Sequence, residues 1–266
     1  MGNPARKPEL RESPKRGHDR VLVLVKALPH VGQRHGETVC CAGVTLGGEW
    51  RRQYPIHFRR LQDNQFSRWQ WIEYDWIAPG TEDRRSESRR VQEDTIQAGE
   101  IMPESERAHF LAPILTGSTT EAAAKGMSLT LIRPAKSVFH FKAKTAEQVA
   151  EERQAYEEAA RQTSFLDPDL SALNPCPFAF HFDWTDADGK PHKATCDDWE
   201  TAVMFYRREK TVGAKAALED MERIFNDRYP ARGMAFAMGT HSRRAEQWLL
   251  VGVLRLDRVT QMSLSL

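Results

Sequence analysis

The sequence predicts an α+β protein. Its N-terminal part is expected to be a small β-rich domain, a barrel of the OB or SH3-like kind, and its C-terminal part an α+β domain of two hairpins and a helical pair. Short strand-like runs separated by tight turns fill the first half, whereas strand-like and helical patterns alternate in the second. A proline-containing stretch at 168–177 separates the halves. The expected domains are a disordered tail (1–20), the β-rich domain (21–142), a helical linker (143–172) and the α+β domain (173–266).

The composition is that of a folded chain with balanced charge. Lys and Arg number 38 and Asp and Glu 37 among 266 residues, so the net charge neither requires nor excludes a polyanionic partner. The N-terminus is polar and the apolar run at 21–25 is short, which predicts a cytoplasmic protein without a membrane partner. The four cysteines fit a reducing compartment, and no disulfide is expected.

The first elements are a tail, a strand and a hairpin. Residues 1–20 are charged and almost without apolar side chains, which predicts disorder, whereas 21–27 has the pattern of a buried strand. The Gly-Gly step at 47–48 predicts a two-residue turn, because glycine adopts positive φ without steric cost. In that register Thr45 faces Trp50.

The remaining elements follow from periodicity and helix propensity. Strands at 127–132 and 137–141 are expected to complete the β-rich domain, and the alanine- and glutamate-rich segment 145–163 a solvated helix. Because Trp248–Leu254 is nearly all apolar, we expect it to be the central strand of the last sheet. The other expected elements are strands at 178–184, 191–195, 234–240 and 247–255, and helices at 197–210 and 214–229.

A basic aromatic stretch at 40–76 contains the densest group of rings in the chain. Arginines along phosphates and rings stacked on bases are what single-stranded nucleic acid requires. The stretch therefore predicts a cytosolic protein that binds single-stranded DNA or RNA through a basic aromatic β surface. The alternatives are that the rings are core residues, since Trp and Tyr are ordinary strand residues, or that they bind a protein partner. The candidate residues are Trp50, Arg51, Arg52, Tyr54, Arg59, Arg60, Trp69 and Trp71.

A second constellation consists of Cys176 and His181, followed by His192 and Cys196. An Asp-Gly turn between the two strands would place His181 opposite Cys196 and bring His181, His192 and Cys196 to one face. Thiolate and imidazole ligands complete tetrahedral zinc sites, so the candidate cofactor is zinc or another divalent metal. Scattered strand residues are the alternative interpretation, because Cys176 lies beyond a proline.

A third constellation lies at the predicted start of a helix. Asp198 and Glu200, with His192, would hold a divalent cation or act as general acid and base in a metal-dependent hydrolase, such as a nuclease. The preferred interpretation is helix capping, with Asp197 as N-cap and Glu200 as its capping-box partner. Familiar catalytic signatures such as a phosphate-binding loop are missing, so catalysis stays an alternative to binding.

Four short motifs resemble a bacterial and archaeal family of two-domain proteins without an assigned activity. The first reads Arg-Gln-Tyr-Pro-Ile-His-Phe-Arg at 52–59, and the second is the loop at 85–88. The others are Asp-Trp-Glu at 198–200 and Gly-Thr-His at 239–241. The resemblance implies two domains and transfers no function. Some relatives carry a Gly-His step and extra cysteines where this chain has Gly189-Lys-Pro-His192, a departure that argues against a complete zinc site.

Overall fold

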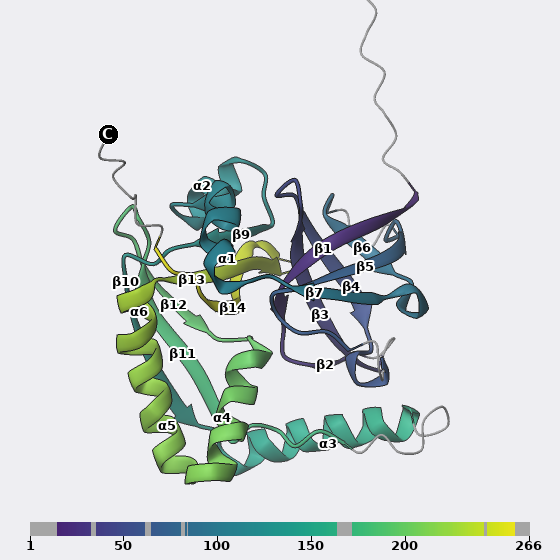
Figure 1. Ribbon diagram of the computed structural model, residues 1–266. Helices are drawn as coiled ribbons and strands as arrows, with labels where there is room; N and C mark the ends of the chain where they lie inside the picture. Colours follow the sequence, from purple (N-terminus) through teal and green to yellow (C-terminus); the bar gives the residue numbers. More distant parts are fainter. Residues whose placement is uncertain are drawn as a thin grey trace, which may run out of the picture.

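The computed structural model describes residues 15–32, 36–61, 65–80, 83, 85–163, 172–241 and 244–258. A β-barrel and a helical part lie side by side, and a small sheet lies between them (Figure 1). The predicted disordered tail lies mostly outside the described residues.

The N-terminal strands form a closed barrel, as the sequence predicted. The hydrogen-bonded order is β1-β3-β4-β6-β5, and β1 also pairs with β5, which closes the ring. β2 pairs with β3, and β7 pairs with β5. The strands are β1 (Arg16–Lys26), β2 (His30–Gly32), β3 (Gly36–Thr45), β4 (Trp50–Ile56), β5 (Gln70–Ile77), β6 (Ser88–Val91) and β7 (Gln97–Ile101), with short 3-10 helices at Phe58–Arg60, Glu93–Thr95 and Ala112–Ile114.

Strand β1 begins earlier than expected, at Arg16 and not near residue 21. Its polar half pairs with β5 from Arg16 opposite Ile77 to Arg20 opposite Glu73. Backbone hydrogen bonds hold this half, so it needs no apolar side chains. Composition alone therefore placed the end of the tail too far along the chain.

The β3–β4 hairpin has a three-residue connection, which corrects the expected two-residue turn. The Thr45 N–H donates to the Glu49 carbonyl at 2.9 Å, and Val44, not Thr45, lies opposite Trp50. Of the two glycines, Gly48 has the positive φ, 79°. A single left-handed residue completes this kind of connection, and the register shifts by one residue as a result.

The C-terminal part contains two sheets and a helical layer. One sheet has the order β14-β13-β9-β8 and the other β10-β11-β12. Its strands are β8 (Leu115–Thr116), β9 (Leu129–Ile132), β10 (Lys136–Ala143), β11 (Phe178–Thr185), β12 (Pro191–Thr195), β13 (Met234–His241) and β14 (Arg244–Arg255). The helices are α1 (Glu104–Leu111), α2 (Thr119–Ala124), α3 (Ala146–Thr163), α4 (Trp199–Val212), α5 (Ala214–Arg223), a π-helix (Ile224–Arg228) and α6 (Tyr229–Arg232).

The expectation that the strands at 127–132 and 137–141 complete the barrel is corrected by their pairing. β9 pairs with β13, and β10 pairs with β11. All four residues of β9 are buried, because the strand lies between two cores. The two hairpins, β11–β12 and β13–β14, and the helical pair α4–α5 agree with the predicted fold class.

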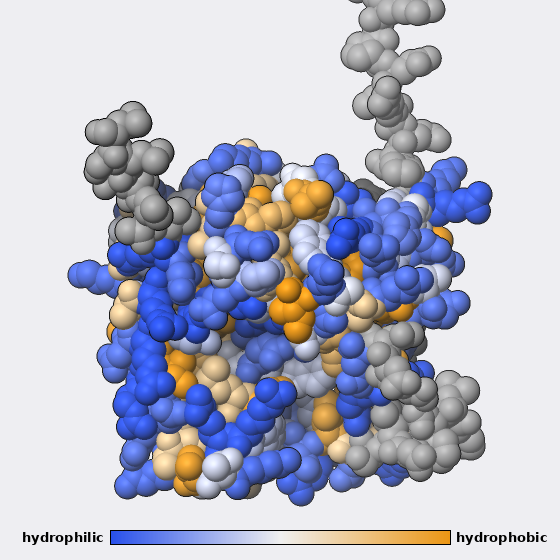
Figure 2. Space-filling model, viewed as in Figure 1, coloured by the Kyte–Doolittle hydropathy of each residue, from blue (hydrophilic) through white to orange (hydrophobic). Residues whose placement is uncertain are grey.

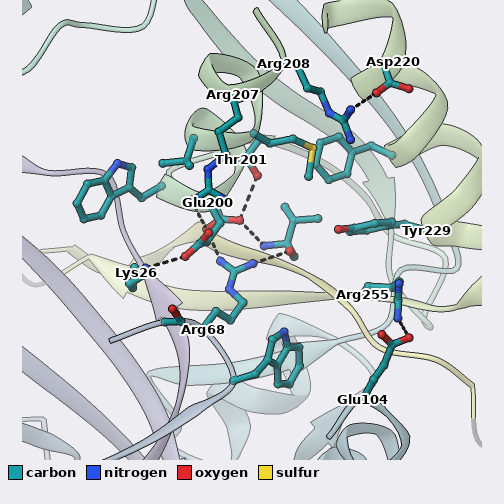
Figure 3. A pocket seen from close by; sticks show the side chains of 18 of the residues that line it. Lys26, Arg68, Glu104, Glu200, Thr201, Arg207, Arg208, Asp220, Tyr229 and Arg255 are labelled. Atoms are coloured by element: carbon teal, nitrogen blue, oxygen red, sulfur yellow. Dashed lines mark hydrogen bonds and ion pairs between the residues drawn. The ribbon is translucent and has the colours of Figure 1, made fainter. Parts of the chain in front are cut away.

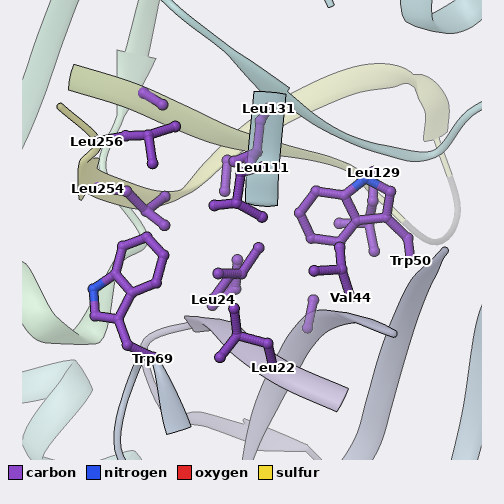
Figure 4. Packing of buried hydrophobic residues seen from close by; sticks show 14 of the residues in the cluster. Leu22, Leu24, Val44, Trp50, Trp69, Leu111, Leu129, Leu131, Leu254 and Leu256 are labelled. Atoms are coloured by element: carbon purple, nitrogen blue, oxygen red, sulfur yellow. The ribbon is translucent and has the colours of Figure 1, made fainter. Parts of the chain in front are cut away.

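β14 lies at the edge of its sheet, although its apolar sequence predicted a central strand. Its side chains belong to two different cores. Leu254 packs with Leu22 and Leu24 of the barrel (Figure 4), and Val251 belongs to the same core. Leu250 instead packs with the phenylalanines of the helical side. The strand is apolar on both faces because the two halves of the protein share it.

Two helices connect the halves or shape the surface between them. α3 runs from the C-terminal part beneath the barrel, where the Tyr156 hydroxyl donates to the Pro29 carbonyl at 3.2 Å (Figure 1). The π-helix precedes Pro230, which lacks an N–H for the carbonyl of Asn226 four residues earlier.

Among the described residues, no helix has the length and apolar character needed to cross a membrane.

Candidate functional site

A hollow of about 1080 Å³ lies between the barrel and the helical layer. We call it the interdomain cleft. On the face shown in Figure 2, hydrophilic side chains gather around a recess between the two halves. Its described basic lining residues are Lys26, Arg68, Arg107, Arg207, Arg208, Arg223 and Arg255. Its described acidic lining residues are Glu104, Asp198, Glu200 and Asp220, so the cationic side chains outnumber the anionic ones.

Asp198 fixes the start of helix α4 at the floor of this cleft. It is the N-cap, and its carboxylate accepts hydrogen bonds from the Glu200 N–H at 3.2 Å and from the Thr201 hydroxyl at 3.1 Å. The Val253 N–H donates to the same group at 3.1 Å, and the side chain of Arg68 forms an ion pair with it (Figure 3). With 1% exposure, Asp198 is a buried and well-bonded carboxylate.

The helix therefore begins one residue later than the capping interpretation placed it. Asp197 still belongs to the extended chain, because its N–H donates to the Leu250 carbonyl at 2.9 Å and its carbonyl accepts from the Leu28 N–H at 2.7 Å. Capping was the correct interpretation of the acidic residues here, but Asp198 is the cap. The Glu200 side chain pairs with Lys26, which corrects its expected role as capping-box partner.

The second carboxylate, Glu200, forms an ion pair of 2.7 Å with the ammonium group of Lys26. Burial opposes its ionisation, yet Lys26 and Arg68 hold the pKa of Glu200 below its usual value. For Arg68, burial likewise opposes the charge, but Asp198 and Glu200 raise its pKa above the ordinary value. Glu200 is thus the ionised partner of the buried Lys26.

The catalytic trio proposed from sequence is not assembled, because His192 lies elsewhere. It stacks on Trp184 with ring centroids 4.2 Å apart, and its Nε2 lies 2.8 Å from a carboxylate oxygen of Asp186. This interaction closes the β11–β12 turn, where Asp186 also accepts from the Lys190 N–H at 2.9 Å. His192 therefore has a structural role at the turn.

The cationic walls of the cleft come from several elements. Arg208 forms an ion pair with Asp220, which Arg223 also approaches, at 3.4 Å. Arg107 of α1 lies over the ring of Trp69, 4.5 Å from its centroid. The described residues therefore occupy only part of the hydrogen-bonding capacity of these arginines.

Arg207 and Tyr229 extend the polar lining. Within the part of the chain that the structure describes, the Arg207 guanidinium has neither an ion pair nor a hydrogen bond, and the residue is exposed. Tyr229 follows the π-helix and projects between Arg208 and Arg255 (Figure 3). Burial raises the pKa of Tyr229, so its hydroxyl stays protonated and can donate a hydrogen bond.

Two of the arginines have buried N–H groups that find no acceptor. The Nε atoms of Arg68 and Arg208 are buried, and neither has a partner among the described residues. An unsatisfied buried donor costs on the order of 1 to 3 kcal/mol, so such groups are often explained by an ion or water that the protein binds.

The rings of the predicted nucleic-acid surface are mostly core residues. Trp50 and Trp69 are 7% and 9% exposed and pack in the core that joins the halves. Trp71 packs edge-on against Phe110 at 5.7 Å. Tyr54 is 41% exposed and is the most accessible ring of the set. The strands use these rings to hold the barrel against its neighbours, which corrects the expectation of a stacking surface on β4 and β5.

The arginines of that surface are engaged by acidic and polar partners. Arg51 pairs with Asp19 at 3.1 Å, and Arg59 donates to Glu37 at 2.7 Å. Arg52, 6% exposed, donates to the carbonyl and hydroxyl of Ser128, both at 3.2 Å. Arg60 is half-buried at the end of a 3-10 helix. Of the predicted set, only Trp69 lines the interdomain cleft.

The four proposed zinc ligands do not come together. In the observed register His181 lies opposite Thr195, not Cys196, so His181 and His192 are on opposite faces of their hairpin. Cys196 is buried in the helical-side core, and its thiol donates to the Thr201 hydroxyl at 3.7 Å. Cys176 is a half-buried free thiol. Among the described residues, no group of three or more such ligands is close enough to hold a metal ion.

Most of the cleft could not be found from the sequence, because its walls are distant in the chain. Lys26, Arg68, Arg207 and Arg255 come from four separate parts of the fold. The one local signal is the basic pair Arg207-Arg208 on the predicted helix.

Comparison with known families divides the chain into two adjacent regions. Residues 17–113 match the Domain of unknown function (DUF8758), and residues 114–266, more than half of the chain, match the Domain of unknown function (DUF8757). The boundary falls before β8, and the interdomain cleft has walls from both regions. A search of curated proteins found no match.

Proposed function

The chain belongs to the DUF8757 family, with a DUF8758 region before it, and we propose that this two-domain protein binds single-stranded nucleic acid in the interdomain cleft. The binding surface is then the cleft between the regions and not the outer face of the barrel.

The observation that carries the proposal is the excess of cationic side chains in one large hollow. Seven basic and four acidic residues line it within the described chain, and Arg207 has no ion-pair partner there. A cleft with an excess of one sign of charge concentrates counter-ions of the other sign. A chain of phosphates supplies such anions at regular spacing, and guanidinium groups bind phosphate with paired hydrogen bonds.

A single strand fits this cleft better than a duplex. The cationic groups lie inside a hollow of about 1080 Å³, where separate nucleotides can enter but a double helix cannot. Rings accompany the arginines, since Trp199 and Tyr229 also line the cleft and are half-buried. Groove cations together with accessible rings are typical of single-strand binders.

The carboxylates do not favour a metal-dependent hydrolase. Asp198 and Glu200 already bond to Arg68 and Lys26, and the histidine of that hypothesis, His192, is remote from them. A protein partner in place of nucleic acid is an outcome that the following experiment distinguishes.

The test measures binding of a fluorescent single-stranded oligonucleotide by anisotropy over a series of salt concentrations. The double variant Arg207→Gln, Arg223→Gln removes two exposed cleft cations. It should weaken binding and reduce the slope of log K against log salt by about 0.7 for each phosphate that the variant no longer neutralises.

A matched control changes two exposed arginines outside the cleft, Arg153→Gln and Arg232→Gln. It should retain the affinity and slope of the wild type. If the wild type does not bind the oligonucleotide at low salt, or if both double variants weaken binding equally, the cleft is not a nucleic-acid site.

A further inference from the structure

The outer face of the sheet β10-β11-β12 carries a second, smaller group of ionisable side chains. The inner face is apolar, with Phe139, Phe182 and Trp184 buried against the helical layer. On the outer face the alternate residues form a hollow of about 190 Å³. We call it the outer-face hollow; its polar lining consists of His140, Lys142, His181, Asp183, Lys193 and Thr195.

Two histidines line this hollow side by side. His140 of β10 lies directly opposite His181 of β11, and their rings stack with centroids 5.4 Å apart and an interplanar angle of 23°. The Thr195 hydroxyl lies 3.3 Å from Nδ1 of His181. Two charged imidazolium rings at this separation repel each other, and a bound anion would offset that repulsion.

The charged groups around the pair favour an anion over a cation. Lys136 and Lys142 lie on the same face of β10, and Lys193 of β12 lies on the same face of the sheet. Asp183, opposite Lys193, is the one acidic residue that the described part of the chain contributes to the lining. Burial, together with the nearby His140 and Lys142, lowers the pKa of His181, which agrees with a locally positive environment.

A solvated sheet face would explain lysines and a carboxylate here, but it does not explain two rings stacked over a hollow. A bound metal is disfavoured by the lysines and by the lack of a third ligand among the described residues. An anion would interact favourably with the two lysines of the lining, Lys142 and Lys193, and with both protonated rings at once.

We propose that the outer-face hollow binds a tetrahedral oxyanion of the phosphate class, with uptake of protons by the His140 and His181 pair. Binding is then tighter in mildly acidic solution than in mildly basic solution. The site is separate from the interdomain cleft and does not depend on nucleic-acid binding there.

The test follows the ring proton signals of the histidines by NMR while the pH is varied, in sodium sulfate and in sodium chloride of equal ionic strength. Sulfate keeps its double charge across the range, so any pH dependence of binding comes from the protein. Sulfate should raise the apparent pKa of the pair. Its affinity should be about fivefold or more higher near pH 6 than near pH 8, the range in which histidine changes charge.

Three variants separate the site from general salt effects. His181→Gln should abolish the response of His140 to sulfate, and Lys193→Gln, an exposed change that leaves both rings in place, should weaken it severalfold. His18→Gln removes an exposed histidine on the barrel and should change nothing. Equal titration curves in sulfate and chloride, or an unchanged response of His140 in the Lys193→Gln variant, would overturn the proposal.

Discussion

The ammonium group of Lys26 in β1 and the carboxylate of Glu200 in α4 form an ion pair of 2.7 Å between the DUF8758 and DUF8757 regions. The side chain of Lys26 is 11% exposed and that of Glu200 is 31% exposed, so Glu200 is the member that solvent reaches. Glu200 occupies a cation that a bound phosphate would otherwise contact. It would therefore compete with the anionic ligand that we propose for the cleft.

Replacing Glu200 with Gln should strengthen oligonucleotide binding. The change removes a negative charge from the cleft and releases Lys26, with an expected gain on the order of fivefold, equivalent to about 1 kcal/mol. Anisotropy titrations at fixed salt measure it. Glu147→Gln, the same change on exposed α3, is the control and should leave affinity unaltered. Weaker binding by Glu200→Gln would mean that the ion pair builds the site and does not compete with the ligand.

The buried Asp198 should be more important for stability than its neighbour Asp197. Asparagine can also cap a helix, so Asp198→Asn isolates the loss of charge opposite Arg68, which should cost about 3 to 5 kcal/mol in the free energy of unfolding. Asp197→Asn should cost less, because Asp197 is neither the N-cap of α4 nor the ion-pair partner of Arg68. Denaturant unfolding of both variants decides between them. Equal costs would contradict the assignment of Asp198 as the cap and ion-pair partner.

The buried tryptophans of the barrel should behave as core residues. Trp50→Ala and Trp69→Ala should each lower the free energy of unfolding by about 3 to 5 kcal/mol, because each empties a large space in the shared core. Tyr54→Ala, a change of an exposed ring on the same strand as Trp50, should cost less than about 1 kcal/mol. Thermal and denaturant melts measure all three. A stable Trp50→Ala variant with reduced oligonucleotide affinity would instead restore the stacking surface on β4.

The ion pair at Glu200 also predicts how stability depends on pH. The pKa of Glu200 is lower in the folded protein than the value of about 4.3 expected for the unfolded chain. Folding therefore gains stability from this group above the unfolded pKa, and loses it as the pH falls through the folded pKa. The difference in unfolding free energy between the wild type and Glu200→Gln should shrink as the pH is lowered from about 6 to about 3. A constant difference would show that the carboxylate is not stabilised by Lys26.

The sequence by itself determined the fold class and most of the elements. Alternating patterns identified the strands on either side of residue 47, and the apolar run at 248–254 identified a buried strand. Helix α4 and its acidic cap were also visible, within one residue. These features depend on local spacing, which a single sequence records directly.

The tertiary structure determined the register, the pairing and the burial of these elements. Loops of odd length after Thr45 and between β11 and β12 shifted two strand registers, and each shift moves side chains to the opposite face. That is why His181 and His192 are apart. The pairing of β9 with β13 likewise depends on which strand is sandwiched between two cores, and no local pattern specifies the partner.

The rings and arginines of the predicted nucleic-acid surface also show that local sequence does not determine which side chains become buried. Trp50 and Arg52 have the residue types of a nucleic-acid surface, but burial against the C-terminal half made one a core residue and the other a link to Ser128. The interdomain cleft instead brings Lys26, Arg68 and Arg207 together across a large part of the chain. Local spacing specifies which residues form an element, whereas the charge of a cleft depends on which elements become neighbours.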